Sequence, residues 1–350
     1  MKILVIRFSS IGDIVLCTPV FRWIKSNLPE SEVHFLTKSK FKHVVNGNPN
    51  LDRVFEWENE EDRTELFKSE YDLIVDLHNN LRSRIVKLRF WGVPIRVLNK
   101  ENFLKALIVG RTQSRLLNFA TRLSWVQQKF NGFAVENIVV RNLGLVKDLN
   151  ERSEDCEIFK SDLELNFYVE EPHQPIELPQ KFAALVLGGT YATKQMPLEL
   201  LLEIVQKLEG NIVLLGGPSE VSLADQLEEK IQLANSNSVL NIINYCGKLN
   251  LNDSAWVAAK SRVVVSGDTG MAHIAAALGC NLIMIWGNTV PDFGMVPPVK
   301  EEANAHHFNV LDLSCRPCSK LGFKACPNKH FRCMMDQDSQ SIRTTMEKYL

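Results

Sequence analysis

Four loops of this sequence combine glycine with acidic, basic or hydroxyl residues, and each follows a short apolar run. They are residues 9–13 (SSIGD), 188–194 (GGTYATK), 216–220 (GGPSE) and 266–273 (SGDTGMAH). Short apolar runs are typical of buried parallel strands, and ligands of open α/β sheets bind beside the carboxyl ends of such strands. The loops are therefore candidates for a site that binds a phosphorylated ligand and moves a proton.

Three of these loops lie in the second half of the chain and are suited to binding a diphosphate. Glycines let backbone N–H groups approach phosphate oxygens, and a helix N-terminus adds a favourable dipole. Lys194 adds a positive charge, and Thr190 and Thr269 add hydroxyl donors. His273 is suited to contacting a phosphate or to capping a helix. One such turn alone is ordinary loop structure, but three in consecutive units favour a nucleotide site.

Other nucleotide-binding classes lack their signatures here. The sequence has no G-x-x-x-x-G-K-[ST] segment, so nothing supports a P-loop NTPase. It has no G-x-G-x-x-G segment after a strand, which weakens a prediction of nicotinamide or flavin binding. We expect the glycine turns, Lys194 and the two threonines together to hold a diphosphate without a metal ion.

Asp13 is the candidate for proton transfer, because it stands where the first apolar run meets the first amphipathic stretch, residues 13–28, which is predicted as one helix despite Pro19. An aspartate with a pKa of ~3.9 is a weak base, so it assists only as an acceptor hydroxyl loses its proton in the transition state. The alternative is a helix N-terminal acid that the helix dipole stabilises. Asp76 and His78 end another predicted strand, and contact with an acceptor and a packing role fit them equally.

The chain is too long for one typical core and alternates twice between strand-like and helix-like segments. An acidic, proline-bearing stretch at 147–180 separates the two arrays. We predict two Rossmann-like α/β domains facing each other across a cleft, residues 1–170 and 171–335. The segment 336–350 is predicted as a C-terminal helix that is able to cross back to the first domain.

Residues 78–129 contain eleven Lys or Arg and one acid, although the whole chain has a net charge of −1. One interpretation is a surface that meets phosphorylated lipid or anionic head groups. The other is a set of solvated helix faces whose inner sides are formed by Ile85, Leu88, Leu107 and Leu116. No RNA- or DNA-binding module is recognisable in the segment, which disfavours nucleic acid. The candidate cations are Arg82, Arg84, Lys87, Arg89, Lys105, Arg111, Arg115 and Arg122.

The composition is that of an ordinary globular protein, with 45% hydrophobic and 23% charged residues. No apolar stretch reaches the ~20 residues that a membrane-spanning helix needs. The first residues, MKILVIRFSSIGD, do not have the pattern of a signal peptide. We therefore expect a cytoplasmic protein.

Two longer segments carry a resemblance to a known family. ILVIRFSSIGDIVLCTP near the start and SGDTGMAHIAAALG in the second half are together specific, and GGTYATKQMP, LLGGPSE and CGKLNL support them. With these motifs the chain resembles the ADP-heptose:lipopolysaccharide heptosyltransferases of glycosyltransferase family nine, over essentially its whole length. The resemblance implies the GT-B fold and an inverting sugar transfer from a nucleotide diphosphate, with ADP-heptose as the family's usual donor. It further implies a glycolipid acceptor at the cytoplasmic face of the membrane and no divalent metal or other cofactor.

The resemblance also assigns roles to individual residues. Asp13 matches the catalytic base, and the turn with Ser9, Ser10 and Gly12 shapes the acceptor side. Thr190 and Lys194 match residues that hold the diphosphate. The other residues that match the donor site, or that lie in its glycine turns, are Gly216, Gly217, Glu220, Asp268, Thr269, Gly270 and His273. Two rival functions are a sugar-nucleotide epimerase or hydrolase of the same fold and a non-catalytic binding protein, which has no need of a base.

Four of the eight cysteines lie close together near the end of the sequence, at Cys315, Cys318, Cys326 and Cys333, with His330 among them. The C-x2-C pair is typical of half a zinc site, but the spacing of the second pair is atypical. Structural zinc, disulfides and reduced thiols all remain open as interpretations. A redox-catalytic role is disfavoured, because nothing nearby resembles a thioredoxin fold.

Overall fold

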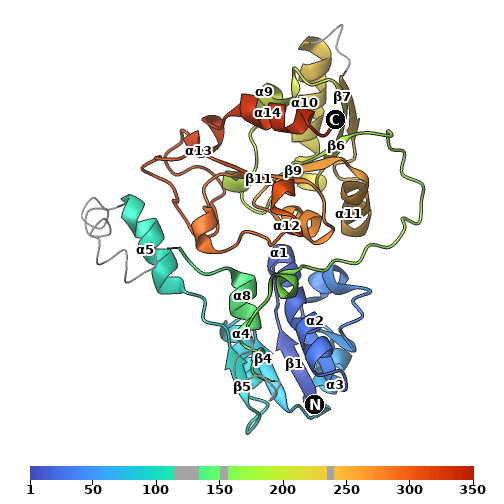
Figure 1. The fold of residues 1–350 in the computed structure, drawn as a ribbon, viewed down its shortest axis with the longest axis vertical. Coiled ribbons are helices and arrows are strands. Elements are labelled where there is room, and N and C mark those ends of the chain that lie inside the picture. Colours follow the sequence, from blue (N-terminus) through green and yellow to red (C-terminus); the bar gives the residue numbers. More distant parts are fainter. Residues whose placement is uncertain (114–133, 150–156, 235–239) are drawn as a thin grey trace. The chain divides into compact units, whose positions relative to one another are not determined.

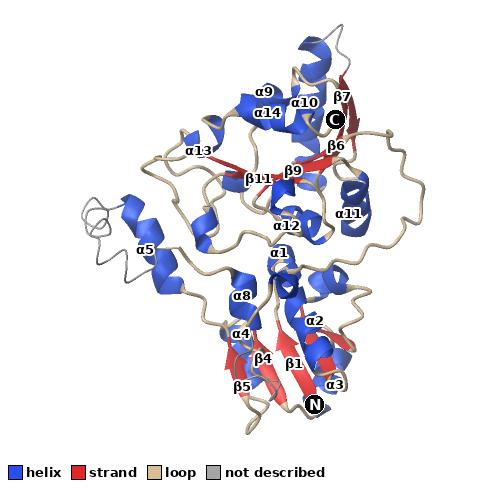
Figure 2. Ribbon diagram, in the orientation of Figure 1, coloured by secondary structure: helices blue, strands red, loops and turns tan. Residues whose placement is uncertain are grey.

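The computed structural model describes residues 1–113, 134–149, 157–234 and 240–350, which form two compact α/β units. The first unit contains Met1–Asn102 and Glu136–Tyr168, and the second contains Phe103–Val135 and Val169–Leu350. Each unit is built around one parallel sheet with helices packed on it (Figures 1 and 2). The fold prediction of two Rossmann-like α/β domains is therefore confirmed. The predicted boundary at residue 170 stays a prediction, and the two units differ from it in the segment 103–135.

The first unit has a parallel sheet with the strand order β3-β2-β1-β4-β5 in its described part. Its central strand β1 pairs with β2 and β4, which places Ile3 opposite Val33 on one side and Leu73 on the other. Apolar side chains on both faces suit such a central strand, because helices cover both sides of a parallel sheet. The strands are β1 (Lys2–Ile6), β2 (Glu32–Thr37), β3 (Arg53–Glu56), β4 (Leu73–Asp76) and β5 (Ile95–Val97).

The helices of the first unit include one correction to a continuous helix predicted over residues 13–28. The structure has two helices there, and Cys17 separates them with Pro19 in the first turn of the second. A proline at that position loses no intrahelical hydrogen bond, so it marks a helix start. The helical elements are α1 (Ile11–Val15), α2 (Thr18–Asn27), η1 (Ser39–Val45), α3 (Glu60–Lys68), α4 (Leu81–Lys87), α8 (Ile138–Leu143) and η3 (Lys160–Leu163).

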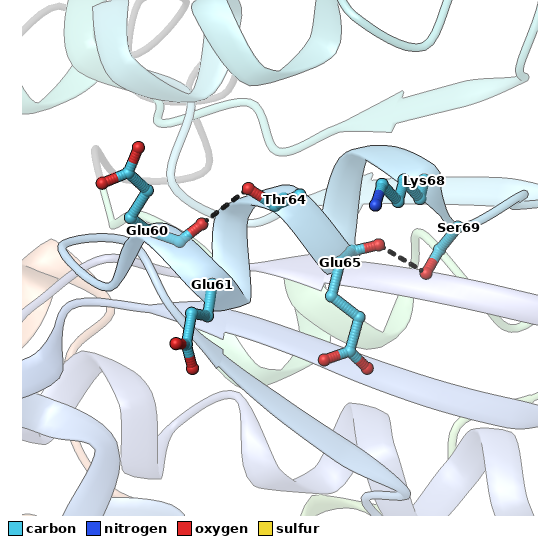
Figure 3. Close-up of a pocket in the computed structure, with 6 residues that line it drawn as sticks. All are labelled: Glu60, Glu61, Thr64, Glu65, Lys68 and Ser69. Atoms are coloured by element: carbon cyan, nitrogen blue, oxygen red, sulfur yellow. Dashed lines mark hydrogen bonds between the residues drawn. The ribbon is translucent and has the colours of Figure 1, made fainter.

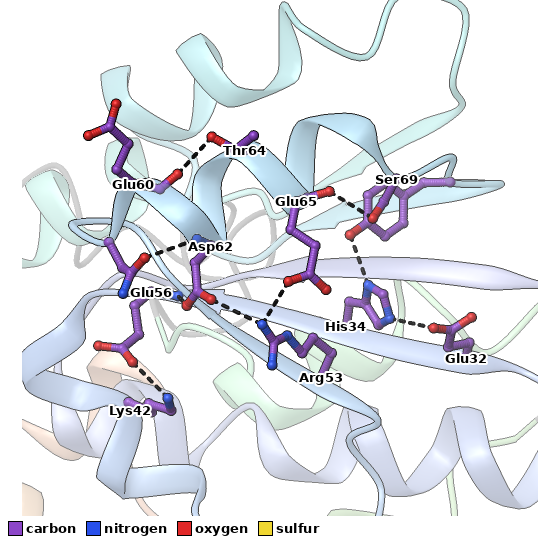
Figure 4. Close-up of polar contacts among 12 residues, drawn as sticks. Glu32, His34, Lys42, Arg53, Glu56, Glu60, Asp62, Thr64, Glu65 and Ser69 are labelled. Carbon is purple, nitrogen blue, oxygen red and sulfur yellow. Dashed lines mark hydrogen bonds and ion pairs between the residues drawn. The ribbon is translucent and has the colours of Figure 1, made fainter.

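Polar contacts fasten α3 to the edge of this sheet (Figure 4). The Asp62 carboxylate accepts hydrogen bonds from the Glu56 backbone at 2.7 Å and from Arg53 at 3.1 Å. On the neighbouring strand, His34 lies 2.9 Å from the Tyr71 hydroxyl and 2.7 Å from Glu32. These contacts are structural, since they satisfy buried polar groups within the sheet and its helix.

The second unit has a parallel sheet with the order β11-β10-β9-β6-β7-β8 in its described part. Its edge strand β11 was not predicted, because its sequence AHHFN lacks an apolar run, and among the described strands it pairs only with β10. The strands are β6 (Ala183–Val186), β7 (Gly210–Leu215), β8 (Leu240–Asn244), β9 (Val263–Gly267), β10 (Leu282–Trp286) and β11 (Ala305–Asn309).

The C-terminal helix packs within the second unit, which corrects the expectation that it crosses back to the first. Ile342 and Met346 are buried in the core of the second unit, and Arg343 Nη1 donates to the Glu203 carbonyl at 3.1 Å. The helical elements of this unit are α5 (Asn102–Gln113), η4 (Ala192–Lys194), α9 (Leu198–Val205), η5 (Pro218–Glu220), α10 (Val221–Ala234), α11 (Leu251–Lys260), α12 (Gly270–Ala277), η6 (Pro291–Phe293), η7 (Glu302–Asn304), α13 (Arg332–Met335) and α14 (Ser339–Glu347). Within the described ranges, every helix is too short or too polar to cross a bilayer.

Candidate active site

Asp13 lies at the third position of α1, in the turn that follows the carboxyl end of β1. Its Oδ2 accepts hydrogen bonds from the Ser10 backbone N–H at 3.1 Å and from the Ser10 hydroxyl at 2.8 Å. This is the helix N-terminal acid that the sequence offers as the alternative. The side chain nevertheless keeps 24% of its surface exposed, so capping the helix and facing a substrate are compatible.

A buried arginine holds Asp13 from the other side. Arg7 Nη2 lies 2.6 Å from Asp13 Oδ1, and Arg7 also donates to the backbone carbonyls of Ser9 and Leu77. Burial alone raises the pKa of Asp13, but Arg7 and the Ser10 hydrogen bonds outweigh it and hold the pKa well below its usual value. Asp13 is therefore ionised at neutral pH. Sequence reasoning missed Arg7, although a charge directly after a buried strand was an available signal.

Two further groups respond to the charges of Arg7 and Asp13. Burial, followed by the nearby Arg7 and Lys100, lowers the pKa of His78 to about 4, so its ring is neutral at pH 7. His78 Nδ1 is a buried atom without a hydrogen-bond partner in the described structure. Burial and Arg7 also lower the pKa of Lys100. Asp76, by contrast, is fully buried in a 2.7 Å ion pair with Lys87, which favours its packing role.

In the second unit the structure brings Lys194 and Asp268 together. Lys194 Nζ lies 2.6 Å from Asp268 Oδ2, which also accepts a 2.8 Å hydrogen bond from the Thr289 hydroxyl. His273 Nε2 lies 3.9 Å from Asp268 Oδ1. Burial alone raises the pKa of Asp268, but Lys194 and His273 outweigh it and lower the pKa below its usual value. A charged lysine is thus held beside the start of α12, where Thr269 is the N-cap and Gly270 the first residue.

Glu220 joins two of the glycine turns. Its carboxylate accepts hydrogen bonds from the Gly217 N–H at 2.8 Å and from Gln195 Nε2 at 3.2 Å. Gln195 also donates to the Gly189 carbonyl at 2.8 Å, which connects the turn after β6 to the turn after β7. A Cβ atom on Gly216 would lie 2.9 Å from the Cβ of Glu220, so this turn requires glycine. Sequence reasoning missed Gln195.

Thr190 lies exposed in the loop after β6, whereas Thr193 of the same loop is buried and forms hydrogen bonds. The Thr193 hydroxyl accepts a 2.8 Å hydrogen bond from the Phe323 N–H, and the Thr193 N–H donates to the Phe323 carbonyl at 3.2 Å. The cysteine-rich segment therefore packs directly on the turn that carries Lys194.

Arg316 fixes that cysteine-rich segment to the end of β10. Its guanidinium donates to the carbonyls of Gly287 at 2.6 Å and Thr289 at 2.9 Å, and to Asn309 Oδ1 at 2.9 Å. Thr289 is the residue whose hydroxyl bonds Asp268. Sequence reasoning missed Arg316, because its local sequence does not indicate hydrogen bonds to residues so distant in the chain.

None of the four clustered cysteines forms a disulfide in the described structure. Cys315 Sγ lies 3.7 Å from His330 Nε2. Burial, followed by the neighbouring Cys318, raises the pKa of the Cys333 thiol to about 12. Over the described ranges, no group of three or more Cys, His, Asp or Glu side chains is arranged to hold a metal ion. A structural zinc ion at these cysteines stays a prediction.

The basic segment is only partly a solvated surface. Lys87 is paired with buried Asp76, and Arg82 lies over the Phe8 ring with 5.5 Å between the guanidinium carbon and the ring centroid. Ile85 and Leu88, predicted as inner-face residues, are exposed, because the opposite side of α4 packs on the sheet. Arg115, Arg122, Leu116 and the side chain of Arg111 lie outside the described residues.

A shallow depression on α3 is unrelated to these loops (Figure 3). It is lined by Glu60, Glu61, Thr64, Glu65, Lys68 and Ser69. Its hydrogen bonds run within the helix, from Thr64 to the Glu60 carbonyl at 2.9 Å and from Ser69 to the Glu65 carbonyl at 3.0 Å. It contains none of the predicted site residues.

The fold and these loops together define a class. Two Rossmann-like units, one with an ionised aspartate at a strand end and the other with glycine turns around a lysine, fit the GT-B fold that the resemblance implies. The model of the family described as glycosyltransferase family 9 (heptosyltransferase) matches residues 63–329. The chain belongs to this family and is a glycosyltransferase, so the epimerase, hydrolase and pure-binder alternatives are not favoured.

Curated relatives and solved structures agree with this family. The chain is 24% identical to lipopolysaccharide heptosyltransferase 1 of Campylobacter coli, over 83% of this chain and 84% of the relative. It is 21% identical to lipopolysaccharide heptosyltransferase 2 of Escherichia coli K12, over 87% of each chain.

Among solved structures, a family 9 glycosyltransferase from Veillonella parvula has a TM-score of 0.68 and 16% identity, covering 99% of this chain and 96% of that chain. E. coli heptosyltransferase WaaC with ADP has a TM-score of 0.62 and 17% identity, with full coverage of both chains. At these identities the structural matches support the fold alone.

Proposed function

We propose that this glycosyltransferase moves a heptose from ADP-heptose to a hydroxyl of a lipopolysaccharide core or a related glycolipid. The names of the curated relatives and the ADP in a related structure support the donor and the acceptor class. The observation that carries the proposal is Asp13, a partly exposed carboxylate that Arg7 and Ser10 keep ionised at the end of β1.

Asp13 acts as the base in this proposal. The acceptor hydroxyl attacks the anomeric carbon, a new C–O bond forms there, and the bond from that carbon to the diphosphate breaks. The hydroxyl proton passes to Asp13 as the attack proceeds. A carboxylate of low pKa takes up the proton only after the hydroxyl oxygen has donated electron density to the new bond and its proton has become acidic. Asp13 therefore assists in the transition state. Ser9, Ser10 and Gly12 form the acceptor side of this turn.

Lys194 stabilises the leaving diphosphate. Asp268 and Thr289 hold its position before substrate binds, so little reorganisation is needed when negative charge develops. Thr190 lies in the loop after β6, and Thr269, Gly270 and buried His273 lie in the first turns of α12, where the phosphates would bind. Because Lys194 and the start of α12 supply positive potential, the proposed reaction includes no catalytic metal or other cofactor.

Glu220 is suited to the nucleoside. Its carboxylate accepts hydrogen bonds from the Gly217 N–H, Gln195 Nε2 and the Ser219 hydroxyl, and its remaining acceptor position fits a ribose hydroxyl group. Gly216 allows this close approach, since any side chain there would meet Glu220.

The proposed place of action is the cytoplasm, against the membrane that carries the acceptor. The basic segment 82–129 supports this, because cations near a membrane surface are attracted by anionic head groups. Nucleic acid is not among the proposed partners.

The test compares Asp13→Asn with the unchanged enzyme. We expect Asp13→Asn to bind ADP with unchanged affinity by calorimetry and to lose transfer by about 10²-fold or more. A matched control is Asp162→Asn, which removes a carboxylate that caps η3 in the same unit. Transfer that survives in Asp13→Asn would remove Asp13 as the base. Thermal stabilisation by UDP or GDP rather than ADP would remove ADP-heptose as the donor.

A further inference from the structure

Helix α4 and the turn after it carry apolar side chains on two sides, and the described part of the structure covers only one of them. Val86 and Phe90 are buried in the core of the first unit. On the other side Leu81 is 75% exposed, Ile85 50%, Leu88 79% and Trp91, just beyond the helix, 98%. The spacing of four and three residues places Leu81, Ile85 and Leu88 along one side of α4 and its C-cap, and Trp91 follows in the turn after the helix. These four exposed side chains are hereafter the α4 face.

The α4 face is unusual for a protein surface that meets only water. Single exposed apolar residues are common, but a contiguous apolar row usually marks an interaction site. A nearly fully exposed tryptophan beside arginines is typical of the membrane–water interface, where the ring sits among head groups.

The charges around the α4 face select an anionic partner. Arg84 and Arg89 are exposed between and beside its members, and residues 77–100 contain no Asp or Glu. Arginine side chains next to an apolar row bind anionic lipid through both charge and buried apolar area. This complementarity favours a phospholipid surface over another apolar protein face.

We propose that the α4 face inserts shallowly into the interface of an anionic phospholipid membrane. The inference rests on the proposed function in one respect, namely that the acceptor is a glycolipid. The first turn of α4 lies next to the acceptor turn, since Arg82 covers Phe8, which directly precedes Ser9 and Ser10. A membrane bound at the α4 face would therefore hold its glycolipid beside the turn that carries Asp13.

The experiment measures binding to vesicles of equal parts phosphatidylcholine and phosphatidylglycerol, with phosphatidylcholine vesicles as the neutral comparison. We expect Leu88→Ser combined with Trp91→Ser to lower the partition coefficient by about tenfold or more. Leu233→Ser is the matched control, because Leu233 is also 79% exposed but lies on α10 in the second unit. Arg84→Gln with Arg89→Gln is expected to weaken binding to the anionic vesicles, as is raising salt from about 0.1 M to about 0.5 M.

Trp91 provides a second measurement. Vesicles should shift the tryptophan emission of the unchanged protein to the blue, and Trp91→Phe should remove most of that shift while binding persists. Equal vesicle binding by the unchanged protein and Leu88→Ser/Trp91→Ser would overturn the proposal. So would a mass measurement showing that this pair of substitutions converts a dimer to a monomer in the absence of any vesicle binding.

Transfer to a water-soluble, de-acylated acceptor separates this proposal from the proposed function. Leu88→Ser/Trp91→Ser should retain that transfer and lose rate only with acceptor in vesicles. Vesicle binding without any transfer by the unchanged protein would contradict the proposed function but would still support the α4 face as a membrane-binding surface.

Discussion

The guanidinium of Arg7 lies 2.6 Å from the carboxylate of Asp13, and Arg7 is buried while Asp13 is partly exposed. The pair is anchored from both sides, because Arg7 also bonds the carbonyls of Ser9 and Leu77 and Asp13 accepts from Ser10. The proposed base is thus fixed in place and in charge state before any substrate arrives.

Removing the Arg7 charge should shift the pH profile of the enzyme. In Arg7→Gln the pKa of Asp13 rises, so protonation inactivates the base at a higher pH and the acid limb of kcat/KM moves upward. Arg7→Lys, which keeps a charge but not the fork geometry, should move it less. The measurement is kcat/KM against pH for the three proteins. If kcat/KM of Arg7→Gln falls at the same pH on the acid side as in the unchanged enzyme, protonation of Asp13 does not cause that fall.

His78 should make stability depend on pH below neutrality. Its pKa is about 4 in the folded chain and ~6.5 in an unfolded chain, so the unfolded state binds the proton first. The stability contributed by the neutral ring is complete above pH ~6.5 and is lost as the pH falls toward the folded value. Denaturant titrations between these limits should show a smaller slope in His78→Gln. His173→Gln, at an exposed position, serves as the control, and equal slopes in both variants would contradict the argument.

Lys194→Gln should weaken ADP binding. The substitution removes the positive charge beside the glycine turns and leaves buried Asp268 without its 2.6 Å partner. We expect a loss of roughly 10- to 100-fold in affinity, since a charge-assisted contact contributes about 1.5–3 kcal/mol. Calorimetry with ADP measures it, and Lys207→Gln, an exposed lysine of the same unit, should change nothing. Unchanged affinity in Lys194→Gln would place the diphosphate elsewhere.

Arg316→Lys should raise the KM for the donor more than it lowers kcat. Arg316 is a positioning residue, because it bonds the Thr289 carbonyl and Thr289 in turn bonds Asp268. A lysine cannot reproduce three contacts of a planar fork, so the Asp268–Lys194 pair loses its support. Steady-state kinetics with varied donor measure the effect, and Arg332→Lys, in an exposed pair with Asp336, is the control. A lower melting temperature with unchanged KM and kcat would show that Arg316 has only a structural role.

The sequence predicted those parts of the fold that local pattern determines. β1, β4, β9 and β10 are continuous apolar runs buried on both faces, so their existence and the loops at their carboxyl ends followed directly. β11 did not follow, because an edge strand of sequence AHHFN shows no apolar period. The break at Cys17 was missed because the amphipathic pattern runs through it without interruption.

The contacts that complete the site depend on distant parts of the chain. The Lys194–Asp268 pair and the contacts of Arg316 with Gly287 and Thr289 join segments that no local period connects. The interpretation that placed Ile85 and Leu88 on the inner side of α4 was wrong for a related reason. When a helix has apolar residues on two sides, its sequence does not indicate which side packs on the sheet.

The division of the chain has a consequence for its synthesis on the ribosome. All of the first unit lies within the first 168 residues, so its sheet can assemble early, while Ile108 and Val135 within that span pack with Val290 and Phe293, which are synthesised later. The core of the second unit includes Ile342 and Met346, so its loops gain full support only after α14 has left the exit tunnel. The first unit is thus expected to mature before the second, which stays exposed to proteases and chaperones in the meantime.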